Sequence, residues 1–449
     1  MSGSTERWPD LFGGDVTGKA GAGKDEPGAG AWSLYSKNQR KGFLFILFLT
    51  GTSSYADRNV LGVLLEPVKA EFGVTDTMLG LLSGLAFALF YVTVGLPIAW
   101  LADRGNRKRI IVWSLVVWSV MTLLCGLAQN FWQLALARVG VGAGEAGAVP
   151  PAQSLIADYY PVEQRAGALG IYMSSSTAGY VIGMIVGGWI AQHYGWREAF
   201  IAIGLPGLLL TLVTRLALSE PRLIPQFTVA HEALEDAWVS IRRLLAKPSY
   251  RNIVCGLVIY YLMAYGALVF TASLLIRVHG LTISQAGGVF GGTMALGAVI
   301  GNLGGGMIVD RLTRWNIDWV ARFAGALLVL ALPLYVVAFL LSDIVLISAI
   351  LLLGSVVLAA AYLATFAALH VVCGSRRRAM AVALAFFFTN LIGLGVGPLM
   401  TGVLSDHMAR IYGPGDGLRY ALTIMCLAFV PAGIFMMRAS KYIRIDAED

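Results

Sequence analysis

Charged residues are rare inside the long apolar stretches of this sequence, and three of them have types and spacing that suit proton chemistry. Asp57 lies in the first stretch, and Arg138 and Glu145 lie in the fourth. Arg138 and Glu145 are seven residues apart, which places them on one face of a helix. Burial and a neighbouring arginine act in opposite directions on the protonation of a carboxyl group. Asp57 and Glu145 are therefore candidate proton carriers.

Two other interpretations of these residues stay open. A buried ion pair between Asp57 and Arg138 could serve only to fix the packing of two helices. Arg138 could instead hold a phosphate of a bound substrate. Arg138 can neutralise only one of the two acids, Asp57 and Glu145. The surplus acid favours proton coupling.

The stretches that carry these charges are long enough to cross a membrane. Of the 449 residues, 57% are hydrophobic and 13% are charged, whereas a soluble protein carries roughly 25% charged residues. A bilayer core needs about 20 apolar residues per helix. Continuous apolar runs exclude a β-barrel, and helices satisfy all backbone polar groups internally. We predict an all-α polytopic membrane protein with twelve helices, over residues 42–66, 77–101, 109–129, 132–156, 166–191, 198–218, 252–277, 286–309, 319–341, 344–372, 379–404 and 418–437.

The distribution of positive charge predicts the orientation of these helices. Of the 33 Lys and Arg residues, 26 fall in the tails and in alternate loops. The positive-inside rule then places both termini and the central linker in the cytoplasm, so the basic loops indicate topology rather than nucleic-acid binding. The predicted divisions are a cytoplasmic tail that is largely disordered, a six-helix half, a linker with an amphipathic helix, a second six-helix half and a cytoplasmic C-terminal tail, over residues 1–40, 41–218, 219–251, 252–438 and 439–449.

The two halves share a weak internal repeat. Asp103-Arg104 follows the second predicted helix, and Asp310-Arg311 follows the eighth. A similar segment precedes the last helix of each half, at residues 195–200 and 417–422. Two parallel six-helix repeats are typical of secondary transporters.

Residues 101–109, Leu-Ala-Asp-Arg-Gly-Asn-Arg-Lys-Arg, resemble the loop motif between helices 2 and 3 of the major facilitator superfamily, although Ala99 stands where that motif often has glycine. Further segments are similar to the Spinster family of that superfamily, whose members move lysophospholipids and sphingolipid phosphates. These segments are residues 55–58, 97–109, 138–146, 156–160 and 163–165.

The resemblance implies where the charged residues lie. In this superfamily helices 1 and 4 face each other across a cavity, which would place Asp57 near Arg138 with Glu145 below. Arg58 is adjacent to Asp57 but points elsewhere on the helix, which makes the outer rim of the cavity one expected position for it. The resemblance also implies that Asp103, with Arg104 beside it, closes the cytoplasmic side against the start of helix 11, where a carboxylate is favoured by the helix N-terminus.

Glycines in the fifth helix have the spacing of an antiporter motif, but Met184 replaces its proline. Small residues also allow close helix packing, so the alternative is tight packing of the fifth helix against the eighth. The glycines are Gly170, Gly179, Gly183, Gly187 and Gly188 in the fifth helix and Gly301, Gly304, Gly305 and Gly306 in the eighth.

The second half differs from the first in its chemistry. No acidic or basic residue occurs between Gly256 and Ile276 or between Ala379 and Leu404. Aromatic and amide side chains occupy these and neighbouring helices instead, and we expect part of them to line the cavity, among them Tyr260, Tyr265, Tyr362, Phe387 and Asn390. A cavity with one charged and one apolar wall suits a solute with an anionic head and a hydrophobic tail.

These observations predict a proton-coupled transporter of lysophospholipids or sphingolipids, working by alternating access in a bacterial inner membrane. The alternative is a proton-coupled multidrug or organic-anion antiporter. An enzyme is disfavoured because the sequence has no phosphate-binding loop and its five histidines are dispersed. We expect no cofactor and no metal; the partners would be an amphipathic solute, protons and the bilayer, and the protein would be a monomer.

Overall fold

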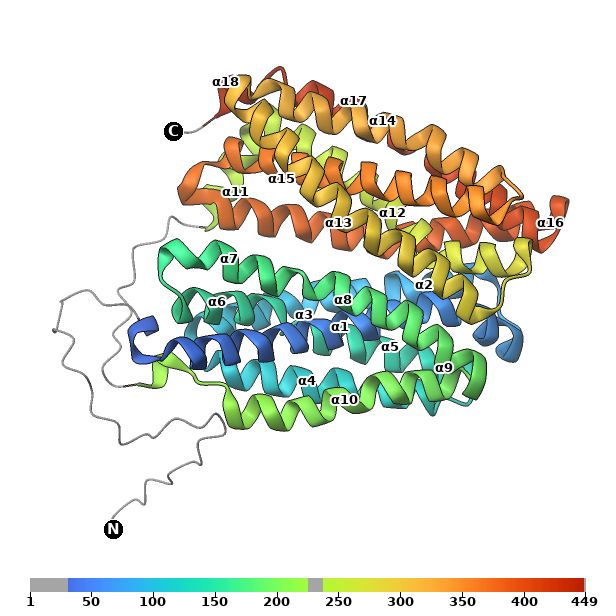
Figure 1. Cartoon of the computed structure of the whole chain (residues 1–449), viewed down its shortest axis with the longest axis horizontal. Coiled ribbons are helices and arrows are strands. Elements are labelled where there is room, and N and C mark those ends of the chain that lie inside the picture. The colour runs from blue at the N-terminus through green and yellow to red at the C-terminus, as the bar shows by residue number, and fades with distance from the viewer. Residues whose placement is uncertain (1–30, 225–236, 448–449) are drawn as a thin grey trace, which may run out of the picture.

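The computed structural model describes residues 31–224 and 237–447, and these are almost entirely helical, with no strand among them (Figure 1). The first half contains η1 (Ala31–Leu34), α1 (Lys37–Phe72), α2 (Asp76–Ser83), α3 (Leu85–Arg104), α4 (Arg107–Gly126), α5 (Phe131–Glu145), α6 (Val149–Tyr159), α7 (Val162–Met173), α8 (Ser175–Val181), η2 (Ile182–Val186), α9 (Gly187–Tyr194), α10 (Trp196–Ala217) and η3 (Pro221–Leu223). The second half contains α11 (Ala237–Ala246), α12 (Pro248–His279), α13 (Ile283–Trp315), α14 (Asp318–Leu340), α15 (Ile344–Phe388), η4 (Thr389–Leu394), α16 (Gly395–Cys426), α17 (Phe429–Ala439) and α18 (Ile443–Asp446).

Helix covers each of the twelve predicted crossings apart from short turns, so the predicted fold is confirmed. Several crossings are built from consecutive pieces, such as α2 with α3 and α5 with α6. The chain turns between crossings at Gly374 and Gly413, which have φ angles of 64° and 83° inside α15 and α16. Glycine adopts this left-handed region without steric cost, which allows a sharp reversal.

Within the described residues, nine segments are long and apolar enough to cross a membrane. The last of them, Met380–Ala439, contains the turn at Gly413 and therefore makes two crossings. The nine do not include α1 or the α5–α6 pair, which carry the intramembrane charges. The described part of the predicted linker contains helix α11, whereas the N-terminal tail before Ala31 and residues 225–236 of the linker lie outside the described residues.

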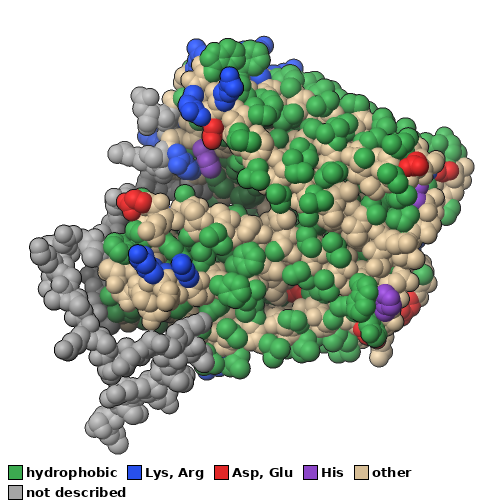
Figure 2. Space-filling view, in the orientation of Figure 1, with side chains coloured by type: hydrophobic (Ala, Val, Ile, Leu, Met, Phe, Trp, Pro, Cys, Tyr) green, Lys and Arg blue, Asp and Glu red, His purple; other side chains and the backbone are tan. Residues whose placement is uncertain are grey.

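The helices form two bundles that lie side by side (Figure 1). We call the end of the molecule that holds the start of α1 and α18 the near end, and the opposite end, with Gly73 and Gly280, the far end. At the far end α2 packs on α16 and α9 packs on α13, which joins the halves. At the near end a recess opens between the halves, and most Lys and Arg side chains visible on this face gather there (Figure 2). The molecule is thus closed at one end and open at the other.

Candidate functional site

Four charged side chains from two helices meet inside the first half. Helix α1 contributes Asp57 and Arg58, and α5 contributes Arg138 and Glu145. Arg58 donates from Nη2 and Nε to the Glu145 Oε2 atom, at 2.7 and 3.1 Å. The Glu145 side chain is fully buried, and that of Arg58 retains 15% of its exposure. Arg58 is therefore the member of the cluster that reaches toward the space between the halves.

Aromatic rings surround the Arg58 guanidinium. Its central carbon lies 5.4 Å from the Tyr55 ring centre, 4.8 Å from that of Phe87 and 4.9 Å from that of Tyr91. Such cation–π contacts favour a cation that has lost part of its water. The three rings hold the guanidinium in place, and Glu145 supplies its counter-charge.

The second arginine meets the first helix differently from the prediction. Arg138 donates from Nη1 to the backbone oxygen of Asp57 at 3.1 Å, not to its carboxylate. Asp57 is fully buried, and neither of its carboxylate oxygens has a hydrogen bond within the described residues, although Thr122 and Arg138 lie around it. The expected surplus of one acid is wrong, because Arg58 pairs with Glu145 and gives two acids and two arginines.

Glycines in α5 allow this cluster to form. A Cβ atom at Gly142 would lie 2.6 Å from the Phe87 backbone oxygen, and one at Gly144 would lie 2.7 Å from the Trp118 backbone nitrogen. Both distances are shorter than real contacts, so only glycine permits α3 and α4 to approach α5 this closely. The close approach is what places Phe87 against both arginines, with its ring centre 5.5 Å from Arg138.

The tyrosines predicted to line the cavity from the second half lie close together around Tyr261. Tyr265 lies near Arg58 and packs against Tyr261 with ring centres 5.2 Å apart, and the Tyr261 ring centre is 6.4 Å from that of Tyr362. These rings form an apolar wall opposite the charged cluster. Tyr260 also contacts Tyr261, with ring centres 5.2 Å apart, and packs against Phe429 inside the second half, at 6.4 Å.

The last two predicted cavity residues lie at the start of the π-helical segment η4 and just before it. The Asn390 side-chain nitrogen donates to the Phe386 backbone oxygen at 2.8 Å. Phe387 is half-buried and contacts Phe388, with ring centres 5.4 Å apart. Asn390 therefore satisfies part of its hydrogen-bonding capacity within its own helix.

The predicted gate residues lie at the near end. The Arg104 guanidinium rests 4.2 Å from the ring centre of Trp100 in the same helix. The side chain of Asp103 lies outside the part of the chain that the structure describes.

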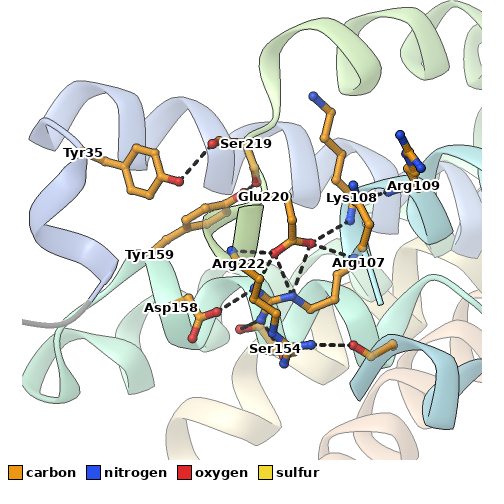
Figure 3. Close-up of polar contacts among 12 residues, drawn as sticks. Tyr35, Arg107, Lys108, Arg109, Ser154, Asp158, Tyr159, Ser219, Glu220 and Arg222 are labelled. Carbon is orange, nitrogen blue, oxygen red and sulfur yellow. Dashed lines mark hydrogen bonds and ion pairs between the residues drawn. The ribbon is translucent and has the colours of Figure 1, made fainter. Parts of the chain in front are cut away.

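A buried charge cluster beside these residues was not predicted (Figure 3). The Arg107 side chain is fully buried and binds Glu220 at 2.6 Å and Asp158 at 2.7 Å. Glu220 also accepts from the backbone N–H groups of Arg107 and Lys108, so it caps α4. The sequence signal was present, since Arg107 belongs to the loop motif and Glu220 begins the linker, but nothing in the sequence showed that they meet.

The alternative interpretation of the glycines predicted that the fifth helix packs tightly against the eighth. For most of these glycines that partner is wrong. Cβ atoms at Gly179 and Gly183 would lie 2.5 and 2.7 Å from backbone oxygens of α1, not of α13. Only Gly188 among the fifth-helix glycines approaches α13, with a Cβ position 3.2 Å from its first backbone oxygen. The eighth-helix glycines Gly301 and Gly305 face α15. Glycines of the fifth helix therefore pack chiefly within their own half.

Comparison with known proteins identifies the family. The model of the Major Facilitator Superfamily matches residues 47–398. A protein of Mycolicibacterium smegmatis described as an MFS-type efflux pump is 31% identical over 402 residues, which are 89% of this chain and 92% of the relative. Protein spinster homolog 1 of Xenopus tropicalis is 26% identical over 426 residues, which are 90% of this chain and 81% of the relative.

A solved structure shows the same relationship. A bacterial homolog of the human lysosomal transporter Spinster, in an inward-facing and unoccupied conformation, matches with a TM-score of 0.84 and 31% identity. The match covers 92% of this chain and 100% of that chain. The chain therefore belongs to the Major Facilitator Superfamily of membrane transporters, and within that superfamily it is similar to the Spinster proteins.

Proposed function

We propose that this protein moves an amphipathic, lipid-like solute of the lysophospholipid or sphingolipid class across the membrane by alternating access, coupled to protons. The observation that carries the proposal is the contrast between the two walls. The first half presents Arg58 in an aromatic setting, and the facing helices of the second half present Tyr261, Tyr265 and Tyr362 without a charge. An anionic head fits the first wall and an acyl chain fits the second.

The coupling follows from the ion pair between Arg58 and Glu145. A proton on Glu145 would remove the negative charge that neutralises Arg58. A partly buried guanidinium without a counter-ion is costly, so an anionic head group would then be favoured in place of the Glu145 carboxylate. Release of the proton would restore the ion pair and expel the head group. Asp57, which is buried and whose carboxylate oxygens have no hydrogen-bond partner within the described residues, is a second candidate carrier of the proton.

The orientation of the chain in the membrane determines which side the open near end faces. With the termini in the cytoplasm, as the Lys and Arg distribution predicts, the recess of Figure 2 faces the cytoplasm. The membrane would be the bacterial inner membrane, and one chain contains both walls of the site, so a monomer suffices.

The test is lysophospholipid transport into proteoliposomes under an imposed pH gradient. We expect gradient-driven transport by the native chain and its loss in Asp57→Asn and Glu145→Gln, since neither amide can carry the proton. Asp416→Asn is the matched control, because it removes an acid from a surface ion pair with Arg419. Normal gradient-driven transport in both amide variants would exclude the coupling.

A second candidate function is proton-coupled export of drugs or organic anions. The relative from Mycolicibacterium smegmatis favours it, because it is described as an efflux pump. Probable galactarate/D-glucarate transporter GudP of Bacillus subtilis, which is 28% identical over 297 residues that cover 60% of this chain and 65% of the relative, also favours an organic anion. Dye efflux or dicarboxylate uptake, without any lysophospholipid transport, would decide for this candidate.

A further inference from the structure

A second set of charges joins the halves at the far end, about one helix length from the start of α1. Arg277, in the last turn of α12, donates from both terminal nitrogens to the two carboxylate oxygens of Asp76, each at 2.7 Å. Its Nε also donates to both carboxylate oxygens of Glu66 in α1, at 2.9 Å. The Arg277 and Asp76 side chains retain 8% and 2% of their exposure. Bidentate, charge-assisted contacts of this kind are among the strongest that side chains make.

The second half also caps a helix of the first half. Asp406 in α16 accepts from the backbone nitrogens of Asp76 and Thr77, at 3.0 and 2.8 Å. It accepts from the Thr77 hydroxyl as well, at 2.6 Å. The first turn of a helix has backbone N–H groups with no partner inside the helix, and a carboxylate there satisfies them and is favoured by the helix dipole. Helix α2 therefore obtains part of its cap from the opposite half.

The backbones of the two halves touch at the same place. A Cβ atom at Gly80 would lie 2.3 Å from the Pro398 backbone oxygen, and one at Gly402 would lie 2.2 Å from that of Asp76. No side chain fits between α2 and α16 at these points. The bidentate pair and the cap are thus held in register by direct backbone contact.

We infer that Arg277 and Asp406 are functional residues of the transport cycle, which lock the far end while the near end is open. We call these two residues with Glu66 and Asp76 the far-end lock. The contacts of Arg277 and Asp406 join opposite halves, so they must break before the far end opens, whereas the ion pair of Lys69 with Asp76 lies within the first half. The inference rests on alternating access as proposed above, and it assigns the closed state to named residues.

The experiment measures the far-end distance in the full-length chain by electron spin resonance, in detergent and in nanodiscs. Labels are placed on cysteines at Gln129, between α4 and α5, and at Ile411 in α16, which are exposed far-end positions in opposite halves. Cys255→Ser removes the exposed native cysteine, and the other three are buried. Arg277→Gln and Asp406→Asn are the test variants. Arg197→Gln is the matched control, because it breaks the ion pair with Glu71 at the same end but within one half.

We expect both test variants to shift the ratio of far-end-open to far-end-closed molecules by about tenfold or more, the size expected for lost charge-assisted hydrogen bonds. The control should keep the native distance distribution. Native distances in both test variants, or an equal shift in the control, would overturn the inference. Asp406→Asn keeps the shape of the side chain, so it still decides the matter if Arg277→Gln does not fold. A shift in distance without lysophospholipid transport would retain the lock and reject only the proposed substrate.

Discussion

At the scale of single residues, Arg58 changes the interpretation of the site. It follows Asp57 in the sequence, and adjacent residues on a helix point about 100° apart. The long side chain nevertheless reaches Glu145 on α5, while Arg138 takes the backbone oxygen of Asp57. Glu145, the acid that the sequence pattern left without a partner, is therefore the partner of Arg58, which was expected at the rim of the cavity.

The shape of Arg58 should matter as well as its charge. Arg58→Gln removes the charge that would bind an anionic head, and we expect the initial rate of transport to fall by about 10- to 100-fold, the size expected for a lost charge-assisted hydrogen bond. Arg58→Lys keeps the charge but loses the planar group that contacts three rings, so its rate should lie between those of Gln and Arg. Initial rates of transport into proteoliposomes measure the effects of both substitutions.

Arg410→Gln serves as the control for this pair, because Arg410 is an exposed arginine of α16 outside the cluster. Equal rates for native protein and Arg58→Gln would show that Arg58 does not bind substrate.

At the scale of helices, the near-end cluster ties three elements of the first half together. Arg107 begins α4, Asp158 lies in the last turn of α6, and Glu220 lies at the start of the linker. Tyr159 donates from its hydroxyl to the Ser219 backbone oxygen beside them, and Tyr35 lies 2.9 Å from the Ser219 hydroxyl. The linker is thus anchored to the first half before it crosses to the second.

Glu220→Ala should destabilise this half. The variant leaves the fully buried Arg107 with only the partly exposed Asp158 as counter-ion, and breaking a buried ion pair costs about 3–5 kcal/mol. Thermal unfolding in detergent should show a clearly lower midpoint. Arg109→Gln is the comparison, because its side chain is exposed on the same turn of α4. A variant that melts with the native protein would show that Asp158 alone neutralises Arg107.

The fifth and eleventh crossings share an irregularity in matching places. Residues Ile182–Val186 and Thr389–Leu394 are π-helical, and Met184 lies in the first of them. A π-helical turn locally widens the helix and is frequent at functional sites. The fifth crossing therefore departs from a regular helix where the antiporter motif has proline, although it has no proline there.

At the scale of the whole molecule, contacts between the halves close the far end, while the near end is open (Figure 2). The far end has the ion pair, the cap and the glycine contacts between α2 and α16. The resemblance to the superfamily implies that Asp103 closes the near end against the start of the eleventh helix in the opposite state. The second and eleventh crossings would then be joined by a different carboxylate cap in each state. Asp406 of the eleventh crossing caps the second at the far end, and Asp103 of the second would cap the eleventh at the near end.

A bulky side chain at the far end should act on the whole molecule. We expect Gly402→Leu to separate the halves there, because even a Cβ atom would lie 2.2 Å from the Asp76 backbone oxygen. The same spin-label pair should report longer distances. Gly304→Leu is the control, because a Cβ atom at Gly304 meets nothing within 4 Å. Unchanged distances in Gly402→Leu would show that the contact adjusts without opening.

The sequence by itself determined the membrane class, the twelve crossings, the two halves and the helices that carry the charges. These follow from hydropathy, charge position and local spacing, which act over one or two turns of a helix. Only the tertiary structure decided the pairing of Arg58 with Glu145, the burial of Arg107 with Glu220 and the far-end lock, in which Asp76 meets a residue 201 positions away. Such contacts depend on how the helices rotate and pack, and on glycines that remove side chains between them, so no local pattern predicts them.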